Sequence, residues 1–406
     1  MVARSPRSFY EFFAGGGMAR VGLGPDWSCL FANDMDAKKA AAYRVNFGED
    51  DLVEGDIASL TGDDLPGTAD LAWASFPCQD LSLAGLGGGL EGARSGTVFA
   101  FWRLIRDLAD EGRAPRLIAL ENVCGALTSR GGGDFARLCQ AFVEAGYGFG
   151  ALVIDARRFT PQSRPRLFLV GARDDLEPPA TLVGDTPEAM FHPPALTRAV
   201  TGLPVELRQA HRWWRLEPPR GRGPSLADIL DLDDAALARS RLGASRTARL
   251  IALMSETQRR RLATLQAQGG RHVGAVFRRT RRGPDGIARQ RAEARFDGLA
   301  GCLRTPGGGS SRQLLLEVEG PRIDARRLTP RETARLMGLP DSYRLPAREA
   351  DALHLTGDGV AAPVVAHLAR GLFEPLLEAV TAGDRAVRPR DLAPAFVREP
   401  SPLAGA

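Results

Sequence analysis

The motif Pro77-Cys78-Gln79 contains a thiol that could act as a nucleophile, and it directly follows the predicted strand 71–75. Ligands bind at the carboxyl ends of the strands in an open α/β sheet, and Pro77 fixes its own backbone φ and stiffens the approach to Cys78. An unperturbed cysteine is only a few per cent thiolate at pH 7, so a nucleophilic thiol needs positive charge nearby. The motif predicts a nucleophile if cations reach the same edge of the sheet.

Charged side chains at the ends of two other predicted strands meet this requirement. Arg164 and Arg166 stand at the start of one strand, and Glu121 directly follows another. A carboxyl group at this edge could donate or accept a proton on a bound ring. Taken singly, Glu121 is explained as a helix-dipole acid and Cys78 as a buried apolar side chain. Their convergence with two arginines favours a catalytic site.

A further set of residues is suited to a nucleoside cofactor. The glycine-rich run 13–17 joins the first predicted strand to a helix, where glycine permits a tight turn and close approach to a ligand. Arg20 stands where the third glycine of the dinucleotide fingerprint is required. Asp34 ends the second strand and could accept hydrogen bonds from ribose hydroxyls, and Asp56 could meet an exocyclic amine. Each aspartate alone is explained as a helix N-cap or a solvated turn; together they predict a bound nucleoside.

Alternating strands and helices must position these residues. The predicted strands are 8–13, 28–33, 51–53, 71–75, 117–120, 152–155 and 166–170, and the predicted helices are 37–46, 98–109 and 135–145. This alternation is typical of an α/β fold with a Rossmann-like, doubly wound sheet. The last two strands could form a hairpin.

The character of the sequence changes after Arg173. Residues 176–224 are proline-rich, 225–268 are helical and polar, and 271–312 contain ten arginines and only three acids. Order returns near Asp324, with a capping box at 329–332 and a final helix over about 362–380. We therefore predict a catalytic domain of residues 1–175 plus 324–382, a smaller irregular domain inserted at 176–323, and a disordered proline- and arginine-rich tail at 383–406.

Composition excludes several classes of protein. The net charge of +4 and a pI of about 9.0 are compatible with nucleic-acid binding, although an excess of arginine over only two lysines, Lys38 and Lys39, is typical of a GC-rich genome. The five cysteines contain no CxxC pair, so we expect neither a disulfide framework nor a metal site. No apolar run near twenty residues and no signal peptide are evident, so we expect a cytoplasmic protein without a membrane span.

Six motifs in order make the chain resemble a bacterial DNA (cytosine-5)-methyltransferase. They are Phe13-Ala14-Gly15-Gly16-Gly17, Pro77-Cys78-Gln79, Glu121-Asn122-Val123, Gln162-Ser163-Arg164-Pro165-Arg166, Arg327-Leu328-Thr329-Pro330-Arg331-Glu332 and Gly357-Asp358-Gly359-Val360. The resemblance implies that Cys78 adds to cytosine C6 and that Glu121 holds N3. It also implies that Arg166 contacts the base oxygen, that Arg164 supports the same pocket, and that Asn122 holds the loop of Cys78.

The resemblance further implies S-adenosylmethionine as the cofactor. The implied cofactor-binding residues are Phe13, Gly15, Gly17, Asp34, Met35, Asp56, Ile57, Pro77, Val98 and Asp358. Three residues depart from the family pattern: Glu11 stands where Asp is usual, Asp34 where Glu is commoner, and Asp358 where Asn is usual. These departures affect the expected cofactor geometry and remove no catalytic group.

The implied partner is double-stranded DNA, from which the target base must be flipped out. The glycine-rich segment 82–95 resembles the family's mobile loop, and the inserted domain would recognise the target sequence. Trp213 and Trp214 are expected to serve packing rather than base stacking. A cognate restriction endonuclease could accompany the protein, which we expect to be a monomer.

Three other interpretations remain open. A tRNA cytosine-5 methyltransferase of the same fold would use the same Cys78 and Glu121, although the long basic middle section favours duplex DNA. A nicotinamide-dependent oxidoreductase would require the complete glycine fingerprint, which is absent. A catalytically inactive DNA-binding relative would be expected to lack Cys78 or Glu121, and both are present.

Overall fold

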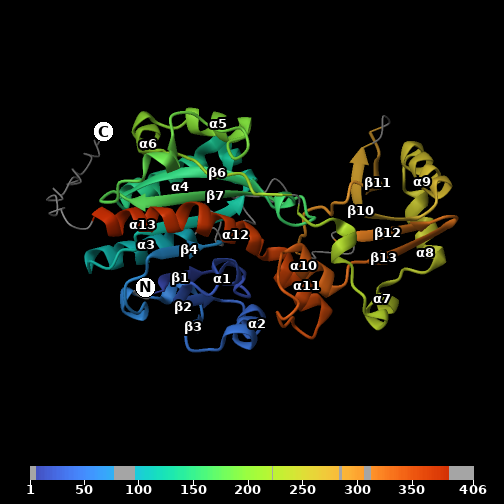
Figure 1. Cartoon of the computed structure of the whole chain (residues 1–406), viewed down its shortest axis with the longest axis horizontal. Coiled ribbons are helices and arrows are strands. Elements are labelled where there is room, and N and C mark those ends of the chain that lie inside the picture. Colours follow the sequence, from blue (N-terminus) through green and yellow to red (C-terminus); the bar gives the residue numbers. More distant parts are fainter. Residues whose placement is uncertain (1–5, 77–96, 222, 283–285, 306–311, 384–406) are drawn as a thin grey trace, which may run out of the picture.

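Seven strands form one large mixed sheet in the computed structural model, which describes residues 6–76, 97–221, 223–282, 286–305 and 312–383 (Figure 1). The strands are β1 Arg7–Phe12, β2 Trp27–Asp34, β3 Leu52–Glu54, β4 Leu71–Ala74, β5 Leu117–Val123, β6 Tyr147–Asp155 and β7 Pro165–Arg173. Their order is β3-β2-β1-β4-β5-β7-β6, with β7 antiparallel to both neighbours. The predicted α/β fold and the hairpin of the last two strands are confirmed.

The order of the strands reverses between β1 and β4, which lie side by side in the middle of the sheet. The chain runs outward from β1 to β3, returns to β4 and continues in the other direction. Such a reversal opens a crevice at the carboxyl ends of the strands, where open α/β sheets bind their ligands. The topology therefore fixes where a site should lie.

Apolar side chains on both faces hold the helices against the sheet. On β1, Phe9 belongs to one core cluster while Tyr10 and Phe12 belong to the other, as the alternation of side chains along a strand requires. Helices α1 (Met18–Leu23), α12 (Ala362–Leu368) and α13 (Glu374–Gly383) cover the first face, and α3 (Thr97–Asp110) and α4 (Gly133–Glu144) cover the second. Helix α2 (Ala37–Phe47) packs near β2 and β3.

The C-terminal helical stretch Glu349–Ala379 is long and apolar enough to cross a membrane by length and composition alone. Its most apolar window is, however, 61% buried within the protein. The packing of α12 and α13 on the large sheet is sufficient to explain this apolar composition (Figure 1).

Residues 176–216 pack on the large sheet, although the sequence analysis assigned them to the inserted domain. Helices α5 (Pro194–Thr201) and α6 (Val205–Ala210) contact β6, and the short strand β9 (Trp213–Trp214) lies against it as well. Trp214 is fully buried and donates its indole N–H to the Val170 carbonyl at 3.0 Å, so it serves packing as expected. From this packing we propose a boundary near residue 217 in place of the predicted one after residue 175.

The inserted part of the chain contains more regular structure than its sequence indicated. Its four antiparallel strands, in the order β11-β10-β12-β13, are β10 Arg271–Arg282, β11 Ala288–Arg295, β12 Leu314–Glu319 and β13 Arg322–Arg327. Helices α7 (Asp234–Ser240), α8 (Ala244–Ala252) and α9 (Glu256–Gln268) accompany this sheet, and a separate apolar cluster around Met254 and Leu316 forms its core. The predicted boundary at residue 324 falls inside β13.

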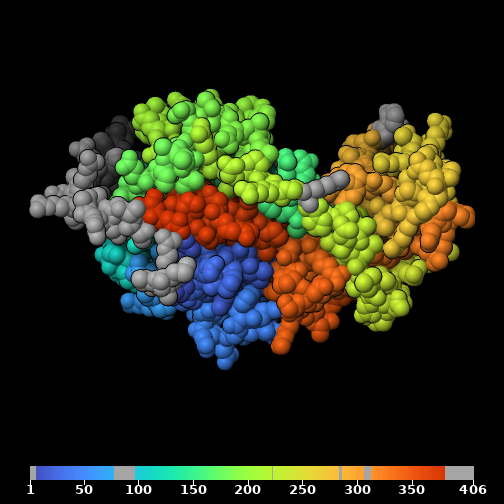
Figure 2. Space-filling view, in the orientation of Figure 1, coloured from blue at the N-terminus to red at the C-terminus, as the bar shows by residue number. Residues whose placement is uncertain are grey.

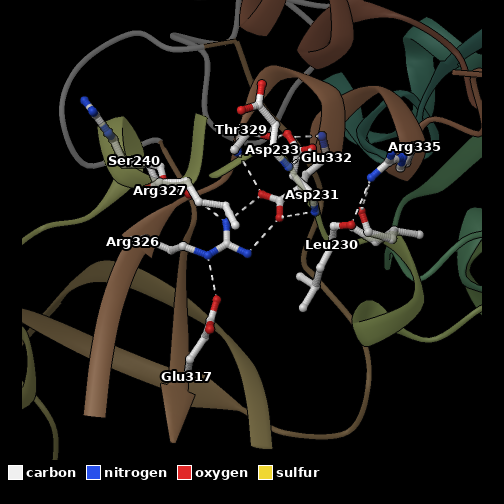
Figure 3. A network of polar contacts seen from close by, with 12 residues as sticks. Leu230, Asp231, Asp233, Ser240, Glu317, Arg326, Arg327, Thr329, Glu332 and Arg335 are labelled. Atoms are coloured by element: carbon white, nitrogen blue, oxygen red, sulfur yellow. Dashed lines mark hydrogen bonds and ion pairs between the residues drawn. The ribbon is translucent and has the colours of Figure 1, made fainter. Parts of the chain in front are cut away.

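A buried polar network joins the inserted sheet to the helix α10 (Pro330–Leu336) (Figure 3). Arg326 of β13 donates two hydrogen bonds to the Glu332 carboxylate, at 2.7 and 2.8 Å, and one to Glu317 at 2.6 Å. Glu332 also accepts the backbone N–H groups of Thr329 and Asp231. The first of these is part of the predicted capping box, which is confirmed. The network links the end of the inserted sheet to α10, which packs with the part of the chain that contains the large sheet.

Candidate active site

The carboxyl ends of β1, β2, β4 and β5 open into one cleft of about 1350 Å³. The predicted positions that line it are Phe13, Gly15, Asp34, Met35, Asp56, Ile57, Glu121, Arg164, Arg166 and Asp358. Gly17 and Val98 do not line it: Val98 is 1% exposed and packs in the core of the second face. Thr97, its neighbour, lines the cleft instead. Pro77 and Cys78 lie outside the described residues.

The glycine-rich turn is held in shape by Asp34. Phe13 and Gly15 both adopt φ of 57°, in the left-handed region that is unfavourable for a residue with a side chain. The Asp34 carboxylate accepts the backbone N–H of Gly15 at 2.7 Å and that of Asp36 at 2.8 Å. Burial raises the pKa of Asp34 against the opposing effect of these hydrogen bonds. Asp34 thus shapes the turn from the position where a ribose contact is expected.

Met35 and Asp56 present two different surfaces to the same part of the cleft. Met35 is 67% exposed although it is apolar, so its thioether offers a polarisable surface for a flat ring. Asp56 is exposed and accepts the backbone N–H of Ala58 at 2.9 Å through Oδ1, as an N-cap does. Asp56 therefore both caps the short helix Ile57–Ser59, as expected, and lines the cleft.

Glu11 and Asp358 bring further acidic groups to the cleft. Glu11 is 1% exposed, and its Oε2 atom has no hydrogen-bond partner among the described residues. Burial raises the pKa of Glu11 to about 8. Asp358 forms an ion pair with Lys39 at 2.7 Å and accepts the Thr305 hydroxyl. The two acids differ, because Glu11 is largely protonated at neutral pH whereas Asp358 is ion-paired with Lys39.

Glu121 and Arg166 form an ion pair at the other end of the cleft, with Nε and Oε1 at 3.1 Å. Because β7 runs antiparallel to β5, its first residues lie at the carboxyl end of β5, where Arg166 pairs in register with Val123. Glu121 is 6% exposed, and burial raises its pKa despite the opposing effects of Arg166 and Arg164. A carboxyl group with a raised pKa can donate a proton or a hydrogen bond to a bound ring.

Arg164 connects three segments around the cleft. Its guanidinium donates to the carbonyls of Leu303 at 2.8 Å, Gly357 at 3.0 Å and Gly359 at 2.7 Å. The residue is only 2% exposed. Arg164 therefore holds Leu303 of the inserted part and the motif 357–360 beside the start of β7.

Asn122 contacts the segment that follows β4. Its side-chain amide donates to the Phe76 carbonyl at 3.3 Å, directly before the segment that contains Cys78. Ser75 and Phe76 line the cleft together with Glu121. The described end of β4 is thus placed beside Glu121 and Arg166, as the sequence analysis required.

The sequence analysis missed two residues in this cleft, Cys302 and Lys39. Cys302 lies 3.4 Å from Arg164 and 3.8 Å from Arg166, measured from its sulfur. Burial raises the pKa of this thiol, but the two arginines lower it more, so the net shift is downward. Among the described residues no group of three or more His, Cys, Asp or Glu could hold a metal ion.

Comparison with known proteins identifies a matching family and several relatives. The family model of C-5 cytosine-specific DNA methylases matches residues 7–374. The Type II methyltransferase M.HpaII of Haemophilus parainfluenzae is 26% identical over 391 residues, which are 92% of this chain and 91% of that protein. M.BsuFI of Bacillus subtilis is 33% identical over 171 residues, which cover 42% of this chain and 40% of that protein.

Two solved structures have the same fold over nearly their whole length. The Dnmt2 methyltransferase of S. pombe has a TM-score of 0.57 and 16% identity, over 92% of this chain and 99% of that chain. A putative DNA modification methyltransferase encoded within an E. coli prophage has a TM-score of 0.54 and 18% identity, over 91% and 99%. At these identities the likeness establishes the fold alone.

Proposed function

The chain belongs to the C-5 cytosine-specific DNA methylase family, and from this premise we propose that it methylates a flipped-out cytosine within a specific sequence of duplex DNA. The proposed methyl donor is S-adenosylmethionine, and the proposed nucleophile is Cys78. The observation that carries the proposal is the Glu121–Arg166 ion pair in the cleft at the ends of β4 and β5. The motif with Cys78 begins immediately after this end of β4.

The cleft has the properties that the proposed cofactor requires. S-adenosylmethionine is cationic at its sulfonium and supplies an electrophilic methyl group when bound. Asp34 and Met35 at the end of β2 would hold the nucleoside, while Asp358, paired with Lys39, brings a carboxylate to the same cleft. Asp56 and Ile57 would contact the adenine ring.

The chain's own residues then carry out the proposed reaction on the base. The Cys78 thiolate adds to C6, while Glu121 donates a proton or hydrogen bond to N3. This addition would give C5 enamine character and so make it a nucleophile for the methyl group that the cofactor, when bound, would supply by cleavage of its S–CH3 bond. Loss of the C5 proton and expulsion of Cys78 restore the aromatic ring. Arg166 would hold the base oxygen, and its ion pair with Glu121 supports the proposal that both groups contact one base.

The proposed DNA surface lies between the two bodies of the protein. Figure 2 shows the outline hollowed between the part that contains residues 176–216 and the inserted sheet. Exposed arginines of β10 and β11, among them Arg279, Arg282 and Arg291, lie on the inserted sheet that borders this hollow. Such side chains donate to phosphates and to guanine edges. We further propose that the inserted domain selects the sequence.

The names of the relatives extend the proposal to the biological setting. M.HpaII and M.BsuFI are Type II methyltransferases, so we propose that this protein acts in the bacterial cytoplasm, as a monomer, beside a cognate restriction endonuclease. The proposed chemistry of the cleft depends neither on the endonuclease nor on the oligomeric state.

Methyl transfer measured side by side on duplex DNA and on tRNA tests the proposal. We expect incorporation of labelled methyl groups into duplex DNA, and none after Cys78→Ala, while cofactor binding by the variant survives. Cys139→Ala, at another cysteine far from the cleft in the core of α4, is the matched control for loss of a thiol. Turnover by the Cys78→Ala variant at the wild-type rate would refute the mechanism, and transfer to tRNA alone would refute the DNA substrate.

A further inference from the structure

Both lysines of the chain lie at the start of α2 and face acidic residues of α11 (Glu349–Asp358). Lys39 forms its ion pair with Asp358 at 2.7 Å, and Lys38 pairs with Asp351 at 3.0 Å. Lys39 lines the cleft and its side chain is 23% exposed, whereas that of Lys38 is 63% exposed and does not line the cleft. The two neighbouring residues therefore differ in their access to a cofactor.

The Lys39 ammonium lies in an acidic environment that keeps it charged. Asp358, Asp34 and Asp36 raise the pKa of Lys39, against the opposing effect of its burial. Asp358 also accepts the hydroxyl of Thr305. Lys39 and Asp358 thus lie side by side on one wall of the cleft, and their ion pair fixes the position of both side chains.

We propose that Lys39 and Asp358 together bind the charged α-amino-acid end of S-adenosylmethionine, with Lys39 contacting the α-carboxylate and Asp358 contacting the α-ammonium. This inference rests on the proposed cofactor and names a residue, Lys39, that no sequence motif indicated. The amino-acid end and the Lys39–Asp358 pair each carry one positive and one negative charge. In the proposed arrangement each charge lies next to a charge of opposite sign. The amino-acid end therefore adds no net charge beside this pair, and the existing ion pair need not be broken.

The choice of lysine over arginine at this position supports the inference. The chain has 53 basic residues, of which only Lys38 and Lys39 are lysines. An ammonium group is a compact point charge with three donors, so it can serve Asp358 and a second carboxylate at once. A guanidinium group is larger and holds its donors in a fixed planar fork, so it fits less readily between Asp358 and a ligand carboxylate. Lys39→Arg should therefore retain the ion pair and lose the proposed contact.

Binding measurements with two ligands test this proposal without measuring turnover. Isothermal titration of purified protein would compare S-adenosylmethionine with 5′-methylthioadenosine, which has the same nucleoside and lacks the amino-acid end. We expect Lys39→Met to weaken binding of S-adenosylmethionine by about tenfold or more, as the loss of one charge-assisted contact does. Binding of 5′-methylthioadenosine should remain unchanged, and Lys38→Met should alter neither ligand.

The outcomes separate this inference from the proposed function. If the wild-type protein fails to bind S-adenosylmethionine, the cofactor assignment itself is refuted. If the wild type binds but Lys39→Met binds both ligands as tightly as the wild type, Lys39 makes no contact. If the variant loses affinity for both ligands equally, the ion pair only shapes α2, and the inference is again overturned. Thermal melting of each variant checks that it is folded, and Asp358→Asn should show the same ligand-selective loss.

Discussion

Replacement of Arg326 by methionine should strongly weaken the junction between the inserted sheet and the catalytic body. The Arg326 side chain is 5% exposed and that of Glu332 is fully buried, so the variant leaves a carboxylate in the interior without its cation (Figure 3). Breaking a buried pair by removing one partner costs about 3–5 kcal/mol. Glu332 keeps two backbone N–H donors, so we expect a loss near the lower end, about 3 kcal/mol.

Urea unfolding measured with two probes would follow this loss. All five tryptophans precede residue 217, so their fluorescence reports on the catalytic body, while far-ultraviolet circular dichroism reports on both bodies. We expect the two probes to separate in the Arg326→Met variant, because the inserted sheet loses its buried ion pair with α10. Arg322→Met is the matched control: Arg322 and Asp324 are exposed, and such pairs contribute about 0–1 kcal/mol.

A double variant makes the test sharper. Glu332→Gln keeps the capping hydrogen bonds to the start of α10 and removes the charge. Combined with Arg326→Met, it should recover a large part of the lost stability, because no uncompensated ion remains. A loss in Arg326→Met no larger than in Arg322→Met would refute the reasoning, and so would a double variant less stable than either single variant.

Two further predictions concern catalysis and acid stability. Glu121→Gln should lower the rate of methyl transfer about 10²- to 10⁴-fold, as the loss of a general acid does, with unchanged cofactor affinity; wild-type turnover in this variant would exclude the assigned role. Burial lowers the pKa of His192 to about 4 and that of His211 to about 3, so both rings stay neutral in the folded protein. Because the unfolded chain takes up these protons below its ordinary histidine pKa, stability should be full above about pH 6.5 and fall as the pH drops towards 4, by up to roughly 1.4 kcal/mol per pH unit for each ring. Urea unfolding of His211→Asn across this range should show a shallower decline, and an identical decline would contradict the explanation.

The catalytic sheet could be predicted from the sequence because its strands carry strong local patterns. The runs that became β1, β2 and β4 are apolar, short and followed by turn residues, so their type and order were evident. Each functional motif directly followed or preceded such a run. The positions of Glu121 and Arg166 at one edge followed from topology alone, and their ion pair agrees with it.

Contacts between distant parts of the chain could not be predicted in this way. Cys302 reaches Arg164 across 138 residues, and Lys39 reaches Asp358 across 319 residues, so no local pattern reveals either pair. The inserted sheet was missed because β10 ends in Arg278-Arg279-Thr280-Arg281-Arg282, where neither face is apolar. Residues 176–216 lack periodicity because they pack as short elements on a sheet formed elsewhere in the sequence.

The turn between β6 and β7 should not tolerate a change in its length. Loops usually tolerate insertions, but here Asp155 accepts the backbone N–H of Arg164 at 2.8 Å, and Ser163 and Pro161 bond to Ala300 at 3.0 and 2.7 Å. An added residue would either detach this turn from Ala300 or slip β7 by one position, which would turn Arg166 to the opposite side of the sheet. Scanning insertions through this turn should therefore abolish activity as completely as substitutions within the cleft.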